Sequence, residues 1–306
     1  MITRLIFSAL LMPLMTVSWA SEMPAIDISM TVVKAPIVGK SMDEVVAEFK
    51  KEAKALNIRH IADSPLYKQF QAMGLSNVRR VEFFQFCNAK VAKALIEYNI
   101  NYAAFLPCRV ALIEDKLGQG WFVMMNPAIL TAQLPADLQQ QIAKICGNLM
   151  KIIGATPHPQ LTDMPKMDFV QMVVIKTPIA EDVEIDEAID SLKLRANELN
   201  VKSVAYHNLT EDYQKLGLSN IKRTEIFQFC DPILGKAMLE YDMSYSAYMP
   251  CRIALVEDEA GKGWFIRMNL KLLIASAQLP PDLHKKAVQF RDKIMEIVDA
   301  GANGEL

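Results

Sequence analysis

Hydrophobic positions along the chain follow the same succession of periods twice. In each half an apolar, β-branched run ends at a proline, which predicts a strand at Thr31–Pro36 and another at Val173–Pro178. A stripe with the 3.6-residue period of an amphipathic helix follows each strand. The stripe consists of Val45, Val46, Phe49, Ala53 and Leu56 in the first half and of Ile185, Ile189, Leu192, Ala196 and Leu199 in the second. We therefore expect one helix with a buried face after each opening strand.

The rest of each half alternates between short strands and helices. Ser41 and Glu44 have the spacing of a capping box at the start of the first helix, and Gly74 and Gly217 suit left-handed helix ends. Four more strands are expected: Ile58–Ala62, a strand that ends at Cys87, Arg109–Glu114 and Trp121–Met125. Helices are expected at about Ala89–Tyr98 and after Pro135. The second half repeats this order. It predicts an α+β fold in which each half is a mostly antiparallel sheet packed against helices.

The two halves also share their residues. Val81–Asn88 reads V-E-F-F-Q-F-C-N, and Thr224–Asp231 reads T-E-I-F-Q-F-C-D. The offset of 143 residues holds without a gap from Asp43 and Asp186 to Asn126 and Asn269. The chain is therefore two copies of one domain joined head to tail. Because a duplicated domain often replaces a homodimer, we expect the copies to pack on each other as a pseudo-twofold pair.

The first 20 residues resemble a signal peptide. Arg4 precedes an apolar run from Leu5 to Val17. Small residues follow at Ser18 and Ala20, the positions that a signal peptidase recognises before its cleavage site. We expect cleavage after Ala20, export to the bacterial periplasm and no membrane span in the mature chain. The proline-rich stretch 154–166 predicts a linker, so that residues 21–153 form the first repeat domain and residues 167–306 the second.

Charge excludes one class of partner. The formal net charge is −2, the sequence pI is about 6.1, and no run rich in lysine and arginine occurs. Proteins that bind nucleic acid need a basic surface, so nucleic acid is not an expected partner.

The order of motifs in each copy resembles the bacterial domain of unknown function 302 family. The similarity rests on a strand, a tight corner and a helix, followed by a Leu-Pro-x-Arg strand, Glu-Asp, a Gly-x-Gly hairpin and an aromatic strand. The family typically has Gly-Asn-Pro at the corner, and this chain has Cys87 and Cys230 in place of the glycine. The family's apolar residue after Leu-Pro is replaced here by Cys108 and Cys251. The resemblance implies a fold, and it supplies neither an activity nor a set of catalytic residues.

The twinned cysteines leave three interpretations open. In an oxidising compartment the pairs Cys87 with Cys108 and Cys230 with Cys251 favour structural disulfides. Cys87 and Cys230 also precede a helix, whose dipole lowers a thiol pKa, so reversible redox dithiols are an alternative. Metal ligands or inert thiols are the third. Cys146 has no twin in the second copy, and we expect it to be a buried thiol.

Metal and cofactor signals are weak. No histidine occurs at the same position in both copies, and no C-x-x-C-H motif is present, which argues against shared zinc or haem sites. The 18 methionines suggest copper, because thioether sulfur suits Cu(I), but no Met-x-x-Met cluster repeats. Core packing explains them better, and we predict no cofactor and no metal site.

A set of polar residues shared by both copies marks the candidate ligand-binding residues. The set comprises Arg109, Arg252, Tyr102, Tyr245, Glu82 and Glu225. One interpretation is structural, with Arg109 paired to Glu82 or to Glu97. The other is a cleft in which the arginines bind an anion and the tyrosines donate hydrogen bonds.

These observations predict an exported, non-catalytic tandem-domain protein that binds a small ligand or a periplasmic protein. Equivalent sites around Cys87, Cys108 and Arg109 and around their twins would do the binding. The first alternative is a periplasmic thiol-redox, sulfur or electron-transfer accessory protein that uses the paired cysteines. The second is a purely structural interaction module.

Overall fold

The structure, a computed structural model, describes residues 26–56, 58–155 and 168–305. The predicted signal peptide and nearly all of the predicted linker lie outside these ranges. Within them, no helix is both long enough and apolar enough to cross a membrane.

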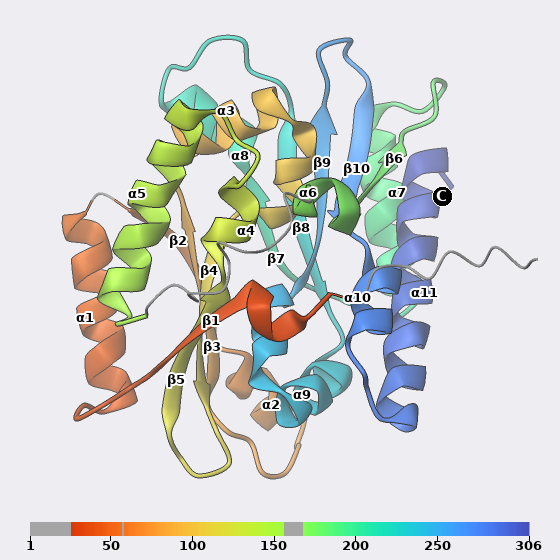
Figure 1. The fold of residues 1–306 in the computed structure, drawn as a ribbon. Coiled ribbons are helices and arrows are strands. Elements are labelled where there is room, and N and C mark those ends of the chain that lie inside the picture. Colours follow the sequence, from red (N-terminus) through yellow and green to blue (C-terminus); the bar gives the residue numbers. More distant parts are fainter. Residues whose placement is uncertain (1–25, 57, 156–167, 306) are drawn as a thin grey trace, which may run out of the picture.

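The two copies have the same order of elements (Figure 1). The first consists of η1 (Ile28–Thr31), β1 (Val32–Pro36), α1 (Met42–Ala55), β2 (Arg59–Ser64), α2 (Leu66–Ala72), β3 (Val81–Cys87), α3 (Ala89–Tyr98), η2 (Ile100–Phe105), β4 (Cys108–Glu114), β5 (Gly120–Met125), α4 (Pro127–Thr131) and α5 (Ala136–Ile152). The second consists of α6 (Phe169–Val173), β6 (Val174–Pro178), α7 (Ile185–Glu198), β7 (Lys202–Asn208), α8 (Leu209–Lys215), β8 (Thr224–Cys230), α9 (Pro232–Tyr241), η4 (Met243–Tyr248), β9 (Cys251–Glu257), β10 (Gly263–Met268), α10 (Leu270–Ser276) and α11 (Pro281–Asn303).

Each copy forms one five-stranded sheet. The strand orders are β1-β5-β4-β3-β2 and β6-β10-β9-β8-β7, and the strand pairs are antiparallel. The predicted α+β fold and the predicted duplication are both confirmed. The predicted capping box is also present, since the Ser41 hydroxyl accepts from the Glu44 backbone N–H and the Glu44 carboxylate accepts from that of Ser41.

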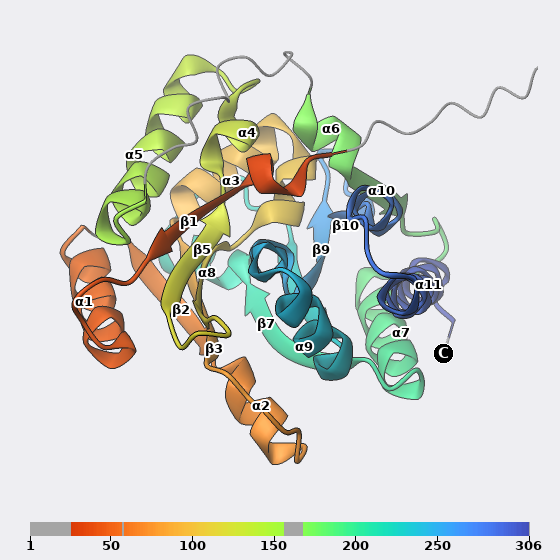
Figure 2. The ribbon, with the colours of Figure 1, turned by 60° about the horizontal axis from the view of Figure 1, so that its bottom comes forward.

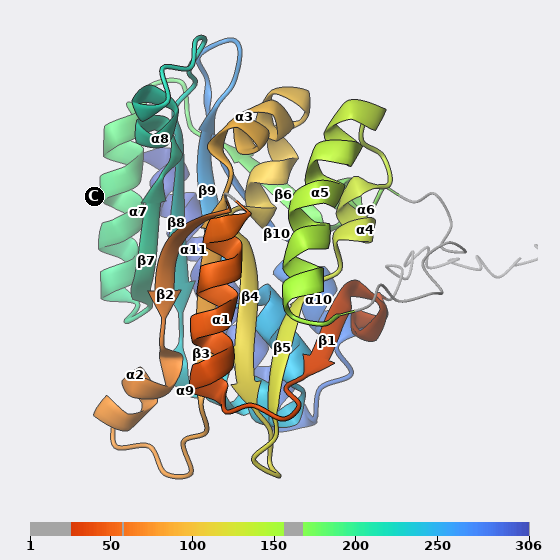
Figure 3. The same ribbon diagram turned by 90° about the vertical axis from the view of Figure 1, so that its left-hand side faces the viewer.

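Two long helices cover the outer face of each sheet. Helices α1 and α5 lie over the first sheet and helices α7 and α11 over the second, so that the sheets are enclosed between them (Figures 1 and 3). In the first copy, Phe49 of α1 packs against Phe84, Phe86 and Phe122 of the sheet. This contact explains the predicted apolar stripe, because the helix buries it on the strands.

The inner face of each sheet is covered by elements of the other copy. Phe83, Ala111 and Val123 of the first sheet belong to one buried cluster with Leu239 of α9 and Ala247 of η4. Reciprocally, the inner face of the second sheet packs against α3 and η2 of the first copy. Figure 2 shows α9 lying between the two sheets. The two copies therefore share a core.

Reciprocal hydrogen bonds mark the pseudo-twofold axis. The buried amides of Gln85 and Gln228 bond each other, with Nε2 to Oε1 distances of 3.1 and 2.7 Å. Arg109 donates to the carbonyl oxygens of Pro250 and Ala247, at 2.9 and 3.0 Å. Its twin, Arg252, donates to the carbonyl oxygens of Phe105 and Pro107, at 2.6 and 3.3 Å. This exchange confirms the predicted pseudo-twofold pair.

Candidate functional site

The second copy contains an apolar cavity of about 110 Å³. Its walls come from the ends of β8 and β9 and from α9, η4, β10, α10 and α11, and Ile28 of the first copy closes one side. Most of the lining is hydrocarbon or sulfur, and it includes Cys230, Cys251, Gly235, Met238, Met249 and Phe290. Methionine side chains adapt to guests of different shape, so such a wall suits a small apolar molecule.

The first copy has a cavity at the equivalent place, and it is smaller, at about 60 Å³. Ala92 stands where the second copy has Gly235, and Ile142 stands where it has Ala287. The larger side chains of the first copy occupy space that is empty in the second. The duplicated fold thus provides two versions of one site, and the second is the more open.

All five cysteines are free thiols, so neither predicted disulfide is formed in this structure. The strand register gives the reason. Phe86 is the partner of Cys108 across β3 and β4, so the neighbouring side chain of Cys87 points to the opposite face of the sheet. Cys230 and Cys251 have the same relation, because Phe229 is the partner of Cys251.

The helix dipole does not control the thiols of Cys87 and Cys230. Burial raises the pKa of both, with a further contribution from the neighbouring cysteine of the same copy. The prediction of a lowered pKa at these two positions is wrong, because each sulfur is enclosed in apolar surroundings where the thiolate is poorly solvated.

Cys108 instead contacts Cys146, the cysteine without a twin. The Cys146 thiol hydrogen-bonds the Cys108 sulfur and lowers the pKa of Cys108, and the positive charges of Arg252 and Arg109 act in the same direction against the effect of burial. The same hydrogen bond raises the pKa of Cys146. At the equivalent of Cys108 in the second copy, burial raises the pKa of Cys251 to about 11.

The tyrosines of the predicted site line the cavities. Tyr102 lies in the wall of the first and Tyr245 in the wall of the second. Burial raises the pKa of each to about 12, so both are protonated at neutral pH. The Tyr245 hydroxyl donates to the carbonyl oxygen of Ala277 at 3.0 Å, which holds the ring against the wall.

The predicted pairing of Arg109 with Glu82 or Glu97 is wrong. In the register of β3 and β4, Arg109 is the partner of Gln85 and shares its inner face, whereas Glu82 is on the outer face. Glu82 pairs with Arg80, Nε to Oε1 at 2.7 Å, and Glu97 pairs with Lys93. The arginines of the predicted anion cleft, Arg109 and Arg252, hold the two copies together.

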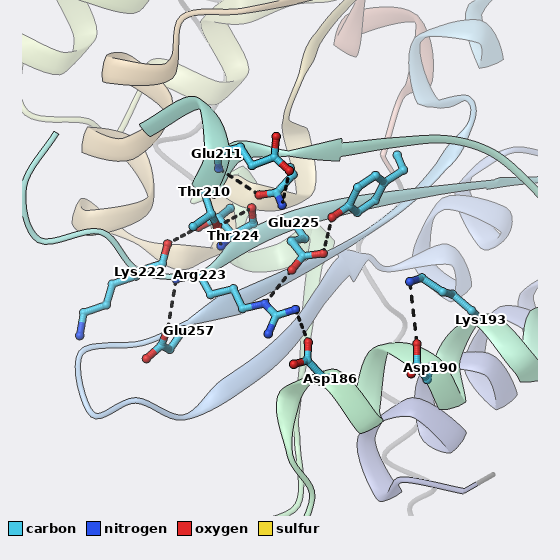
Figure 4. Close-up of polar contacts among 12 residues, drawn as sticks. Asp186, Asp190, Lys193, Thr210, Glu211, Lys222, Arg223, Thr224, Glu225 and Glu257 are labelled. Carbon is cyan, nitrogen blue, oxygen red and sulfur yellow. Dashed lines mark hydrogen bonds and ion pairs between the residues drawn. The ribbon is translucent and has the colours of Figure 1, made fainter. Parts of the chain in front are cut away.

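Glu225 lies in the corresponding network of the second copy, away from the cavity. Its Oε1 accepts from Arg223 Nε at 2.6 Å and its Oε2 accepts from the Tyr206 hydroxyl at 2.6 Å. Figure 4 shows Arg223 between Glu225 and Asp186, so that it ties strand β8 to helix α7. Neither Glu82 nor Glu225 lines either cavity.

Comparison with known families decides the assignment of the chain. The model of "Domain of unknown function DUF302" matches residues 34–155 and again residues 175–301, which is well over half of the chain. The chain belongs to the DUF302 family. Each of the two structural copies contains one of the matched segments.

The chain is also similar to a solved structure, the crystal structure of an uncharacterized conserved protein DUF302 from Bacillus stearothermophilus. It is 16% identical over 42% of this chain and 98% of that chain, with a TM-score of 0.37. No curated protein matches the chain. The site of this DUF302 protein therefore has to be interpreted from its own geometry.

One residue of the second DUF302 copy was missed by the sequence analysis. Arg267 lies in β10, is only 6% exposed and lines the larger cavity. Its equivalent in the first copy is Met124. A comparison that keeps only residues shared by both copies discards it. The signal that could have found it is a charged residue within the apolar strand Gly263–Met268.

Metal ligands do not gather within the described ranges of this DUF302 protein. Residues 26–56, 58–155 and 168–305 contain no group of three or more His, Cys, Asp or Glu side chains placed to hold an ion. The candidate site is therefore built from apolar side chains, thiols and arginine.

Proposed function

We propose that this protein is a non-catalytic binding protein that takes up a small apolar ligand in the cavity of its second copy. The observation that carries the proposal is that cavity of about 110 Å³, together with its smaller counterpart at equivalent positions. An apolar cavity of roughly 150 Å³ is enough to bind benzene. The size of this one fits a ligand of a few carbon atoms.

The place of action is part of the same proposal. Residues 1–20 have the composition of a signal peptide, and the protein would bind its ligand in the periplasm after their removal. The amino-terminal sequence of the exported protein tests this, since it would begin at Ser21.

The cavity is tested by exchanging the residue that sets its size. A Cβ atom built on Gly235 would be 3.5 Å from Cys230 Sγ and 4.0 Å from Met249 Sδ, which are ordinary contacts, so Gly235→Ala fits the fold. We expect it to weaken binding of 1-pentanol about tenfold or more, because one methyl group fills part of the pocket. The methyl NMR signals of methionine report the site, since Met238 and Met249 line this cavity.

Two controls separate a filled cavity from a damaged protein. Gly235→Ala is expected to raise the free energy of unfolding by about 0.5–1 kcal/mol, because glycine is unfavourable inside a helix. Ala92→Gly, the reverse change at the equivalent position, is expected to leave 1-pentanol binding to the second cavity unchanged. Absence of 1-pentanol binding to the wild-type protein, or equal binding by Gly235→Ala, contradicts the proposal.

The contact between Cys108 and Cys146 favours a second candidate function, thiol redox chemistry in the first copy. The Cys108 thiolate would attack a low-molecular-weight disulfide, form a mixed disulfide and release one thiolate. Cys146 would then attack the Cys108 sulfur and release the second thiol. The protein thereby loses two electrons and the small disulfide gains them.

Alkylation rates test this candidate. Cys108 is partly exposed and its pKa is lowered, whereas its partly exposed twin Cys251 has a raised pKa. We expect Cys108 to react with iodoacetamide several-fold faster than Cys251, and Cys146→Ala to remove the difference. Cys146→Ser keeps a hydrogen-bond donor and should preserve it. Peptide mapping by mass spectrometry gives both rates, and equal rates in the wild-type protein contradict the redox candidate.

A further inference from the structure

Arg267 places a buried positive charge in the wall of the larger cavity. Its one hydrogen bond within the described part of the chain is weak, from Nη1 to the carbonyl oxygen of Met268 at 3.5 Å. Its buried Nε has no partner there. The carboxylate of Asp299 acts on it electrostatically but does not hydrogen-bond it within the described part of the chain. The guanidinium therefore has donors to spare for a ligand.

The other charged groups of the wall are already engaged. Arg252 bonds the carbonyl oxygens of Phe105 and Pro107. Asp231, the acidic residue of the lining, accepts from the backbone N–H groups of Ile233 and Leu234 as the cap of α9. The lining thus carries two positive charges and one negative charge, and Arg267 is the cation whose guanidinium N–H groups are not taken up by close hydrogen bonds.

A buried charge without a partner is unfavourable for folding, because it has lost its hydration. The first copy avoids that cost with Met124, which is 4% exposed and packs in the core at the same position. The fold therefore does not need an arginine there. A ligand with a negative charge would pair with it, and a planar carboxylate matches the guanidinium best.

We propose that the cavity of the second copy binds a short-chain carboxylate of about four to six carbon atoms, a size set by comparison with benzene-binding cavities. The hydrocarbon chain lies against Met238, Met249 and Phe290, and the carboxylate accepts hydrogen bonds from Arg267. This inference rests on the proposed binding function and names its ligand class. The first copy, with Met124 and the smaller cavity, does not bind such an anion.

The test compares three probes with chains of equal length, which are pentanoate, pentanamide and 1-pentanol. Isothermal titration calorimetry on the full-length mature protein is expected to show at least tenfold tighter binding of pentanoate than of pentanamide. Arg267→Met, which copies the first domain, is expected to lower pentanoate affinity to that of pentanamide. It should leave pentanamide and 1-pentanol binding unchanged, whereas an unfolded variant would lose the binding of all three probes.

The conservative variant and the reciprocal variant complete the experiment. Arg267→Lys keeps the charge and is expected to retain part of the preference for pentanoate. Met124→Arg is expected to leave the affinity of the second cavity unchanged. If Arg267→Met does not fold, the comparison of pentanoate with pentanamide on the wild-type protein decides by itself.

Failure of the anion assignment and failure of the binding function give different results. If 1-pentanol binds and pentanoate binds no more tightly than pentanamide, the ligand is neutral and the assignment to a carboxylate is overturned. If none of the three probes binds, the proposed function fails with it. If pentanoate binds equally to the wild-type protein and to Arg267→Met, the anion lies elsewhere and the role of Arg267 is overturned.

Discussion

Replacing Arg109 by alanine is expected to lower the free energy of unfolding by about 3 kcal/mol. The guanidinium donates to the carbonyl oxygens of Pro250 and Ala247 in the other copy, at 2.9 and 3.0 Å, and its removal leaves both without that donor in a buried interface. Hydrogen bonds to a charged group contribute about 1.5–3 kcal/mol each, and removal of the repulsion between Arg109 and Arg252 offsets part of the loss. Urea denaturation measures the difference.

A partly exposed arginine outside the interface serves as the control for Arg109→Ala. Arg291 bonds the carboxylate of its neighbour Asp292, and its replacement by alanine is expected to change stability by less than about 0.5 kcal/mol. Should Arg109→Ala be as stable as the wild-type protein, the hydrogen bonds of Arg109 across the interface contribute nothing to folding. Arg109 would then return as a candidate for anion binding.

The amide pair at the pseudo-twofold axis is expected to show strong coupling in a double-mutant cycle. Gln85→Leu alone leaves the amide of Gln228 buried without its partner, and Gln228→Leu does the same to Gln85, so each should cost about 2 kcal/mol. The double variant places two leucines side by side and leaves no orphaned amide. Its cost is expected to be at least about 1 kcal/mol less than the sum of the single costs.

Chemical denaturation of the four proteins in the cycle gives the coupling energy. Additive costs would mean that the two amides do not depend on each other. In that case the reciprocal bond does not stabilise the shared core, although the two copies would still be joined through their arginines.

Local sequence predicted most of the fold and little of its assembly. The periods of hydrophobic residues were sufficient for the sheets and for helices such as α1, because burial of Phe49 and its neighbours repeats every turn. The short helices α4 and α10 and the 3₁₀ turns η2 and η4 are too brief to show a period. They were not predicted, and they form much of the cavities and of the interface.

The candidate site depended on contacts that no local pattern contains. The register of β3 against β4 decides that Arg109 is on the inner face and Glu82 on the outer one, and register is set by pairing over distance. The contact between Cys108 and Cys146 joins a strand to a helix that is distant in sequence. Arg267 was missed for another reason. The first copy has Met124 at the equivalent position, so a search for residues common to both copies does not find it.

The most direct test of this account is a crystal structure of the mature wild-type protein under xenon pressure. Xenon enters dry apolar cavities without needing hydrogen bonds, so it reports the space itself. We predict a xenon atom in the second copy, between Gly235, Met238 and Phe290, and none behind Ala92 in the first. Xenon absent from the second copy, or present in both copies, would contradict the claim that duplication left one open binding site.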